Sequence, residues 1–229
     1  PAILAISNGM PLRAVAVFYR APLLSLVSPG HVLNPKDLEG KKVAVSRIGS
    51  ESHRYGVLML QNSGVDAKRV TFIQTGSTTV SLTALQQGSV EAAVLSPPFT
   101  GVMARQGFRI LMRSRDLIEA PWLGVVTSQQ KVQRQPERVR SLLKAMKETL
   151  KAIRQDRRAV TGYIQQVWKV DPEVAEEAYE DINGVIIDDM FMPEERLKSY
   201  LDHAHRRGEL SKMLAVGEVI DYSLLKSLQ

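Results

Sequence analysis

The chain has 229 residues, of which 44% are hydrophobic and 24% are charged. This composition is ordinary for a globular protein and excludes a disordered or fibrous chain. No apolar stretch approaches the ~18 residues that a membrane-spanning helix needs, and the opening residues lack the basic and long apolar regions of a signal peptide. The chain contains no cysteine, which excludes disulfides, thiolate metal sites and a cysteine nucleophile.

The net charge of +6 is distributed unevenly along the chain. Residues 131–158 carry a net charge of +7, whereas residues 171–195 contain ten acidic residues and no lysine or arginine. Solvated helix faces are the simplest interpretation of both runs, and a docking surface for a partner is the alternative. No aromatic-interleaved basic motif accompanies the basic run, so nucleic acid is not predicted as a partner.

The first half of the chain alternates short β-branched runs with turn residues and helical patterns. Strands are predicted at residues 12–19, 23–28, 42–46, 70–73, 90–95 and 108–112. Helices are predicted at residues 51–63, 78–87 and 103–106. Successive strand–helix units of this kind predict a parallel sheet covered by helices.

The second half of the chain is predicted to be mainly helical. A one-face apolar stripe predicts a helix over residues 139–153. Two more helices are expected to begin at Asp171-Pro172 and at Met192-Pro193, the latter ending at Gly208. A lone strand at residues 122–127 separates the halves, which indicates that the chain crosses back there to a different lobe.

Small and hydroxylated residues gather where three predicted strands end, at residues 46–52, 75–79 and 96–99. Ligands of open parallel sheets bind beyond the carboxyl ends of strands, and N–H groups at helix starts hold carboxylates, sulfonates, nitrate or phosphate. Arg47 adds a cation. The alternative is that each serine or threonine only caps its helix, and Glu51 argues against an anion because a carboxylate would already occupy that helix start.

Other chemistries find little support in the sequence. Neither a phosphate loop nor a dinucleotide-binding glycine motif is present. The four histidines lack partners at metal-ligand spacing, no serine lies in a nucleophile elbow, and Asp188-Asp189 fits a strand end better than an acid–base pair. The aromatic residues that fall at strand ends or lobe crossings can stack on a ligand or pack in the core; they are Phe18, Tyr19, Phe99 and Trp122.

Three segments carry a family resemblance: RAVAVF at residues 13–18, DLEGKKVAVSRIGS at 37–50 and LQQGSVEAAVLSPP at 85–98. They resemble the nitrate, sulfonate, taurine and thiamine-precursor family of ABC-transporter solute-binding proteins, which includes pyrimidine-synthase-like members. The resemblance implies an α/β periplasmic-binding-protein fold of type II, with two lobes built on parallel sheets and a helical C-terminal tail. Residues 1–29 with 121–229 are the expected first lobe, incomplete at its N-terminus, and residues 30–120 the second.

The resemblance also implies a function. A small anionic or heteroaromatic solute is expected to be held between the lobes by hinge closure, without chemical change, cofactor or metal, and delivered to an ABC-transporter permease outside the cytoplasm. The implied contacts, together with Gly76 and the aromatic residues Tyr19 and Trp122, are Arg47, Gly49, Ser50, Ser52, Ser77, Thr78, Ser96 and Pro97.

Two other functions remain open on the sequence, both known in proteins of this fold. One is an enzyme of pyrimidine- or menaquinone-precursor synthesis, although the pyrimidine branch relies on cysteines that this chain lacks. The other is the effector-binding domain of a LysR-type regulator. Members of the family usually begin with a further β-α-β-α stretch; if that stretch is truly absent, the exposed sheet edge predicts a homodimer.

Overall fold

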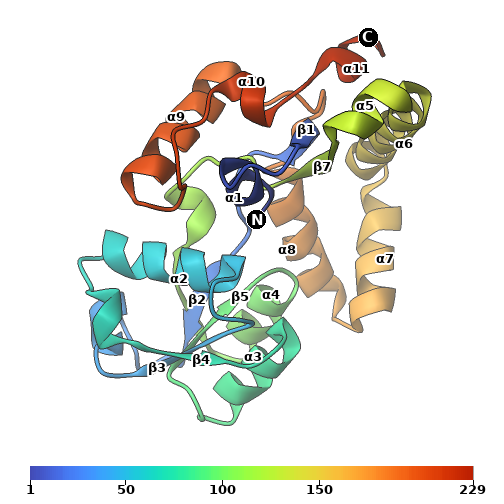
Figure 1. Cartoon of the computed structure of the whole chain (residues 1–229). Helices are drawn as coiled ribbons and strands as arrows, with labels where there is room; N and C mark the ends of the chain where they lie inside the picture. The colour runs from blue at the N-terminus through green and yellow to red at the C-terminus, as the bar shows by residue number, and fades with distance from the viewer. Residues whose placement is uncertain (229) are drawn as a thin grey trace. The chain divides into compact units, whose positions relative to one another are not determined.

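The computed structural model describes residues 1–228, which form two compact units (Figure 1). Among the described residues, unit 1 consists of Pro1–Pro22, Glu119–Arg157 and residues 183–228. Unit 2 consists of Leu23–Ile118 and Arg158–Ile182. Within the described part of the chain, no helix combines the length and apolarity needed to cross a bilayer.

Unit 2 is built around a five-stranded mixed sheet in the order β4-β3-β5-β2-β6. Its strands are β2 (Ser25–Ser28), β3 (Lys42–Val45), β4 (Thr71–Gln74), β5 (Ala92–Leu95) and β6 (Arg109–Arg113). Strand β3 pairs in parallel with β4 and β5, as the strand–helix rhythm predicts. Strand β2 instead pairs antiparallel with both β5 and β6, which corrects the expectation of a wholly parallel sheet.

A helix follows each of the three parallel strands of this sheet. These helices are α2 (Glu51–Asn62), α3 (Thr78–Gln86) and α4 (Phe99–Arg105), and short 3-10 helices lie at Pro35–Leu38, Ala67–Arg69 and Ser114–Asp116. The four residues of β5 are all buried, as expected for a central strand covered on both faces. The core joins Val27, Ala44 and Leu95 of the sheet to Leu85 and Met103 of the helices.

Helices α7 (Arg157–Trp168) and α8 (Pro172–Asn183) belong almost entirely to unit 2. The rings of Phe99 and Trp168 meet edge to face with centroids 5.5 Å apart. Arg105 of α4 pairs with Glu177 of α8 at 3.0 Å. Side-chain contacts between distant segments therefore attach this helical pair to the sheet of unit 2.

The predicted division of the chain differs from the structure in two places. Residues 23–29 were expected in the first lobe, but β2 lies between β5 and β6 in the sheet of unit 2. Residues 158–182 were also expected there, but α7 and α8 belong to unit 2. Neither assignment follows from local sequence, because strand pairing and long-range ion pairs decide both.

Unit 1 contains a two-stranded antiparallel sheet of β1 (Leu12–Tyr19) and β7 (Leu123–Ser128) rather than the predicted parallel one. The strand at residues 122–127 is thus not alone. The helices of this unit are α1 (Ala2–Ser7), α5 (Gln129–Arg134), α6 (Pro136–Gln155), α9 (Glu194–Arg206), α10 (Val216–Val219) and α11 (Ser223–Lys226). Its core gathers Ile6, Val17, Leu197, Leu201 and Val219.

Candidate functional site

Three loops of unit 2 begin at the same edge of its sheet. Because β3, β4 and β5 run in parallel, their carboxyl ends lie together; Val45 is paired with Gln74, and Ala44 with Ala93. We call the loop residues at this edge the rim, comprising residues 46–52, 75–78 and 96–97. The rim contains nine of the eleven residues expected to contact a ligand.

Hydrogen bonds tie the first two rim loops to each other. The Gly76 N–H donates to the Ser46 carbonyl at 2.8 Å, and the Ile48 N–H donates to the Gln74 side-chain oxygen at 3.1 Å. Gly49 and Gly76 have φ angles of +81° and +91°, a left-handed conformation in which a Cβ is disfavoured. The first two rim loops are therefore held together by one main-chain hydrogen bond and one bond to the Gln74 side chain.

Three serine hydroxyls form a cluster at the start of α2. The Ser52 hydroxyl lies 2.9 Å from that of Ser46 and 3.0 Å from that of Ser50, and it accepts the Ser46 N–H at 3.0 Å. The Ser50 hydroxyl donates to the Arg47 carbonyl at 2.6 Å and does not cap α2. Hydroxyl groups can rotate, so this cluster can turn a donor toward a ligand oxygen by giving up one internal bond.

The start of α3 contains a true helix cap. The Ser77 hydroxyl accepts the Val80 N–H at 3.2 Å, so the capping interpretation is correct at this position. Behind it, the Thr75 hydroxyl lies 2.6 Å from the hydroxyl of the buried Ser81. The contacts predicted from the sequence do not include Ser46, Thr75 and Ser81. The signal for Ser46 and Thr75 is a hydroxyl residue directly after a strand, and the signal for Ser81 is a hydroxyl residue four positions beyond a helix cap.

Three rim side chains have no hydrogen-bond or ion-pair partner within residues 1–228. They are the exposed guanidinium of Arg47 and the half-buried hydroxyls of Thr78 and Ser96. Pro97, joined to Pro98 by a cis peptide bond, follows Ser96 directly. A cation and two hydroxyl groups thus remain available to an anionic ligand at this edge of the sheet.

Two ionisable groups, one in the rim and one directly after it, are engaged with their own helix or loop. The Glu51 carboxylate lies 3.7 Å from the Arg54 guanidinium one turn along α2, which offsets part of its negative charge at the helix start. The His53 Nδ1 atom accepts the Gly49 N–H at 3.2 Å. Partial burial lowers the pKa of His53, which favours the neutral ring that this hydrogen bond requires.

The two remaining predicted contacts lie in unit 1. The rings of Tyr19, at the end of β1, and Trp122, before β7, are stacked with centroids 6.1 Å apart and planes 24° apart. Both residues are half-buried, and burial raises the pKa of Tyr19. Such a pair offers a flat surface on which a ring or an apolar chain can lie.

The histidines and carboxylates of residues 1–228 form no group of three that is placed to hold a metal ion. The carboxylates of Asp188 and Asp189 also differ in their contacts, because Asp188 is bound by Arg154 whereas Asp189 accepts the Phe191 N–H. The Arg47 guanidinium and the hydroxyl groups of the rim are the groups with which it can hold an anion, by charge and hydrogen bonds.

The chain has a type II periplasmic-binding-protein fold, because solved structures of that fold superimpose on nearly all of it. The chain belongs to the family described as NMT1/THI5 like, which matches residues 2–159. The expected fold class and family resemblance are thereby confirmed. No curated protein matches the chain.

Three solved structures illustrate the likeness. The alkanesulfonate-binding protein SsuA of Xanthomonas axonopodis pv. citri, bound to MOPS, is 18% identical with a TM-score of 0.75, and the alignment covers 96% of this chain and 77% of that one. The periplasmic aliphatic sulphonate binding protein SsuA of Escherichia coli is 19% identical with a TM-score of 0.74, over 99% and 78% of the two chains. A mutant of the desulfurization enzyme DszB with biphenyl-2-sulfinic acid is 14% identical with a TM-score of 0.69, over 95% and 78%.

Proposed function

We propose that this protein binds a small organic oxyanion at the rim of unit 2 and passes it unaltered to an ABC-transporter permease. The observation that carries the proposal is the set of unpartnered donors on the rim, namely the Arg47 guanidinium and the hydroxyls of Thr78 and Ser96. Charge-assisted hydrogen bonds from such groups bind an anion more strongly than neutral ones do.

Sulfonates and sulfinates are the ligand class we favour. Two of the similar structures are sulfonate-binding proteins, and a third holds a sulfinic acid. These groups are compact anions with several acceptor oxygens, which matches a rim that offers several donors from three loops.

A thermal-shift titration tests the ligand class. Ligand binding to the native state raises the apparent stability, by about 2.7 kcal/mol at a hundred times the dissociation constant. Methanesulfonate, MOPS, taurine and nitrate are compared with methanesulfonamide, a neutral analogue of methanesulfonate with similar size. We expect at least one oxyanion to raise the melting temperature and the sulfonamide to leave it unchanged. A sulfonamide that acts as strongly as the sulfonate, or no effect from any oxyanion, contradicts the proposal.

An enzyme acting on a sulfinate is the second candidate, because the DszB structure shares the fold. This chain has no cysteine, so a reaction that needs a thiol nucleophile has no residue to carry it. Incubation of the protein with biphenyl-2-sulfinate, followed by proton NMR, separates the two functions. Full recovery of the sulfinate supports a binding protein, whereas release of biphenyl supports the enzyme.

The transport role places the protein outside the cytoplasmic membrane. The Escherichia coli relative is described as periplasmic, which supports this placement. Osmotic-shock fractionation of cells that express the complete natural gene tests it. Recovery with the periplasmic marker is expected, and recovery only with the cytoplasmic marker contradicts the transport role.

A further inference from the structure

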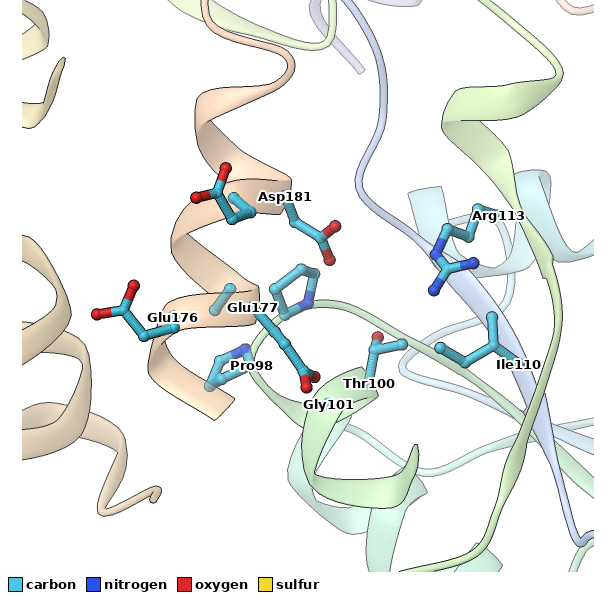
Figure 2. Close-up of a pocket in the computed structure, with 11 residues that line it drawn as sticks. Pro98, Thr100, Gly101, Ile110, Arg113, Glu176, Glu177 and Asp181 are labelled. Carbon is cyan, nitrogen blue, oxygen red and sulfur yellow. The ribbon is translucent and has the colours of Figure 1, made fainter. Parts of the chain in front are cut away.

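Unit 2 contains a cavity of about 330 Å³ between helix α4, the end of strand β6 and helix α8 (Figure 2). It shares Pro97 with the rim, but none of the other predicted rim contacts lines it. Figure 2 shows Thr100 and Arg113 on one side of this cavity and Glu177 and Asp181 of α8 on the other. The cavity therefore has a donor wall and an acidic wall.

The donor wall contains two buried polar atoms without partners. Thr100 is 3% exposed, and its hydroxyl makes no hydrogen bond to residues 1–228. The Thr83 hydroxyl in α3, by contrast, donates to the Thr79 carbonyl of the preceding turn at 3.1 Å. The Nε atom of Arg113 is likewise buried and unpartnered. An unpaired buried polar group is unfavourable because it has lost its hydrogen bonds to water, so these two atoms suit a ligand that accepts from both.

The acidic wall contains four acidic residues of α8, and two of them, Glu177 and Asp181, are each paired through only one carboxylate oxygen. Glu177 and Asp181 are four residues apart on α8 and therefore share one face of the helix. Glu177 Oε1 pairs with Arg105 at 3.0 Å, and Asp181 Oδ1 pairs with Arg115 at 2.5 Å. The second oxygen of each carboxylate makes no hydrogen bond within residues 1–228. Both oxygens remain able to accept from a cationic group.

We propose that this cavity is a second binding site, which takes a small zwitterionic amino acid. The ligand carboxylate accepts from Arg113 Nε and the Thr100 hydroxyl, and the ligand ammonium donates to Glu177 Oε2 and Asp181 Oδ2. A ligand with only a negative charge is repelled by the carboxylates of α8 and gives their second oxygens no donor. A ligand with only a positive charge is repelled by Arg113 and gives its Nε atom no acceptor. Only a molecule with both charges satisfies both walls.

Isothermal titration with matched ligands tests the charge requirement. The zwitterions glycine, β-alanine and 4-aminobutyrate differ in the distance between their charges, while propionate and propylammonium each keep one charge of β-alanine. We expect one of the three zwitterions to bind at least tenfold more tightly than propionate and propylammonium. Equal binding of either single-charge compound, or no binding by any of the three zwitterions, overturns the proposal.

Two variants test the assigned contacts. Thr100→Val keeps the side-chain volume and removes the unpartnered hydroxyl, so we expect the ligand-free protein to melt at the same or a higher temperature while the affinity for the zwitterion falls at least threefold. Arg113→Lys keeps the charge but removes Nε, and we expect at least a tenfold loss. Arg109→Lys, at the exposed start of the same strand, is the matched control and should bind normally. Unchanged affinity in both Thr100→Val and Arg113→Lys overturns the proposal.

The second site is separable from the rim. Thr100→Val should leave the methanesulfonate-induced thermal shift unchanged, and Arg47→Gln should leave zwitterion binding unchanged. If the sulfonate shift is absent from the wild-type protein while the zwitterion binds, the proposed function is wrong and the second site stands. If Arg47→Gln lowers zwitterion affinity as much as Arg113→Lys does, the cavity is not a separate site and the proposal is overturned.

Discussion

The Ser77 hydroxyl accepts the Val80 N–H at 3.2 Å, so one residue of the rim caps α3 and also belongs to the proposed binding site. The two roles respond differently to substitution. Aspartate caps a helix about as well as serine does, but its charge repels an anion. Alanine removes the cap without adding a charge.

We therefore expect Ser77→Ala to destabilise the protein by about 0.5–2 kcal/mol, and Ser77→Asp to cost much less stability while abolishing the methanesulfonate-induced shift. Urea unfolding measures the first effect and thermal-shift titration the second. Thr83→Asp, on the same helix but beyond its first turn, controls for the added charge. If Ser77→Asp binds methanesulfonate as the wild type does, the start of α3 is not part of the binding site.

Arg47 is expected to supply the main attraction for the anion. Its guanidinium is exposed and has no partner within residues 1–228, so Arg47→Gln should have little effect on the free energy of unfolding. We expect the affinity for methanesulfonate to fall at least tenfold, and the residual affinity to depend less on salt than in the wild type. Lys68→Gln, in the 3-10 helix before β4 and thus at the opposite edge of the sheet, removes the same charge and should bind normally. Equal affinities for the Arg47 and Lys68 variants would exclude Arg47 from the site.

Ser50→Asp tests the start of α2 in the same way. Ser50 precedes Glu51, and its hydroxyl donates to the Arg47 carbonyl, which a carboxylate cannot do. We expect weaker oxyanion binding through like-charge repulsion, measured by thermal-shift titration. Ser50→Ala loses the same hydrogen bond without the charge and separates the two effects. Unchanged affinity in Ser50→Asp would remove this helix start from the site.

The basic run at residues 131–158 contains at least one structural arginine. Arg154 of α6 donates to Asp188 at 2.6 Å, to the Asn183 carbonyl at 2.8 Å and to the Asn183 side chain at 2.7 Å. Lysine cannot reproduce this planar set of donors. We expect Arg154→Lys to lower the free energy of unfolding by about 1–3 kcal/mol. The exposed Lys151 lies on the same helix, and Lys151→Gln should change stability by less than about 0.5 kcal/mol; equal losses in the two variants would contradict the structural role of Arg154.

Local patterns predicted much of unit 2 correctly, and they failed where distant contacts decide. The three parallel strands, their helices and the shared edge at Val45 and Gln74 follow from hydrophobic periodicity and turn residues. The direction of β2 does not, because a four-residue apolar run has the same pattern in a parallel and an antiparallel pairing. Helix α7 was not predicted. Its exposed hydrophobic residues Tyr163, Val167 and Trp168 lie outside the buried face, so the sequence shows no clear one-face apolar pattern.

The candidate sites show the same division. The hydroxyl-rich loops could be recognised because glycine, serine and threonine after a strand are a local signal. Whether a hydroxyl is engaged, as in Ser77, or unpartnered, as in Ser96, depends on the folded geometry. Thr100 and Arg113 carry no sequence signal of their own, because a threonine in a helix and an arginine at a strand end are both ordinary. They can be recognised as candidate ligand contacts only in the folded structure, where they lie across one cavity from the carboxylates of α8.

His53 predicts how stability depends on pH. Burial lowers the pKa of His53 in the folded protein, and its Nδ1 atom must be unprotonated to accept the Gly49 N–H. The unfolded chain, with a histidine pKa of about 6.5, therefore binds a proton more readily than the folded one. The stabilising contribution is complete above that value and is lost as the pH falls through the lower pKa of the folded state.

Urea unfolding between pH 5 and pH 8 measures this dependence. We expect His53→Gln to reduce the loss of stability at acid pH, because the glutamine oxygen can still accept the Gly49 N–H and does not titrate. His31→Gln removes an exposed histidine elsewhere in unit 2 and should retain the wild-type pH dependence. Since Gly49 belongs to the rim, protonation of His53 should also loosen the start of α2, and the affinity for methanesulfonate should change with pH in the wild type more than in His53→Gln. An identical pH profile in the wild type and His53→Gln would show that this histidine contributes to neither property.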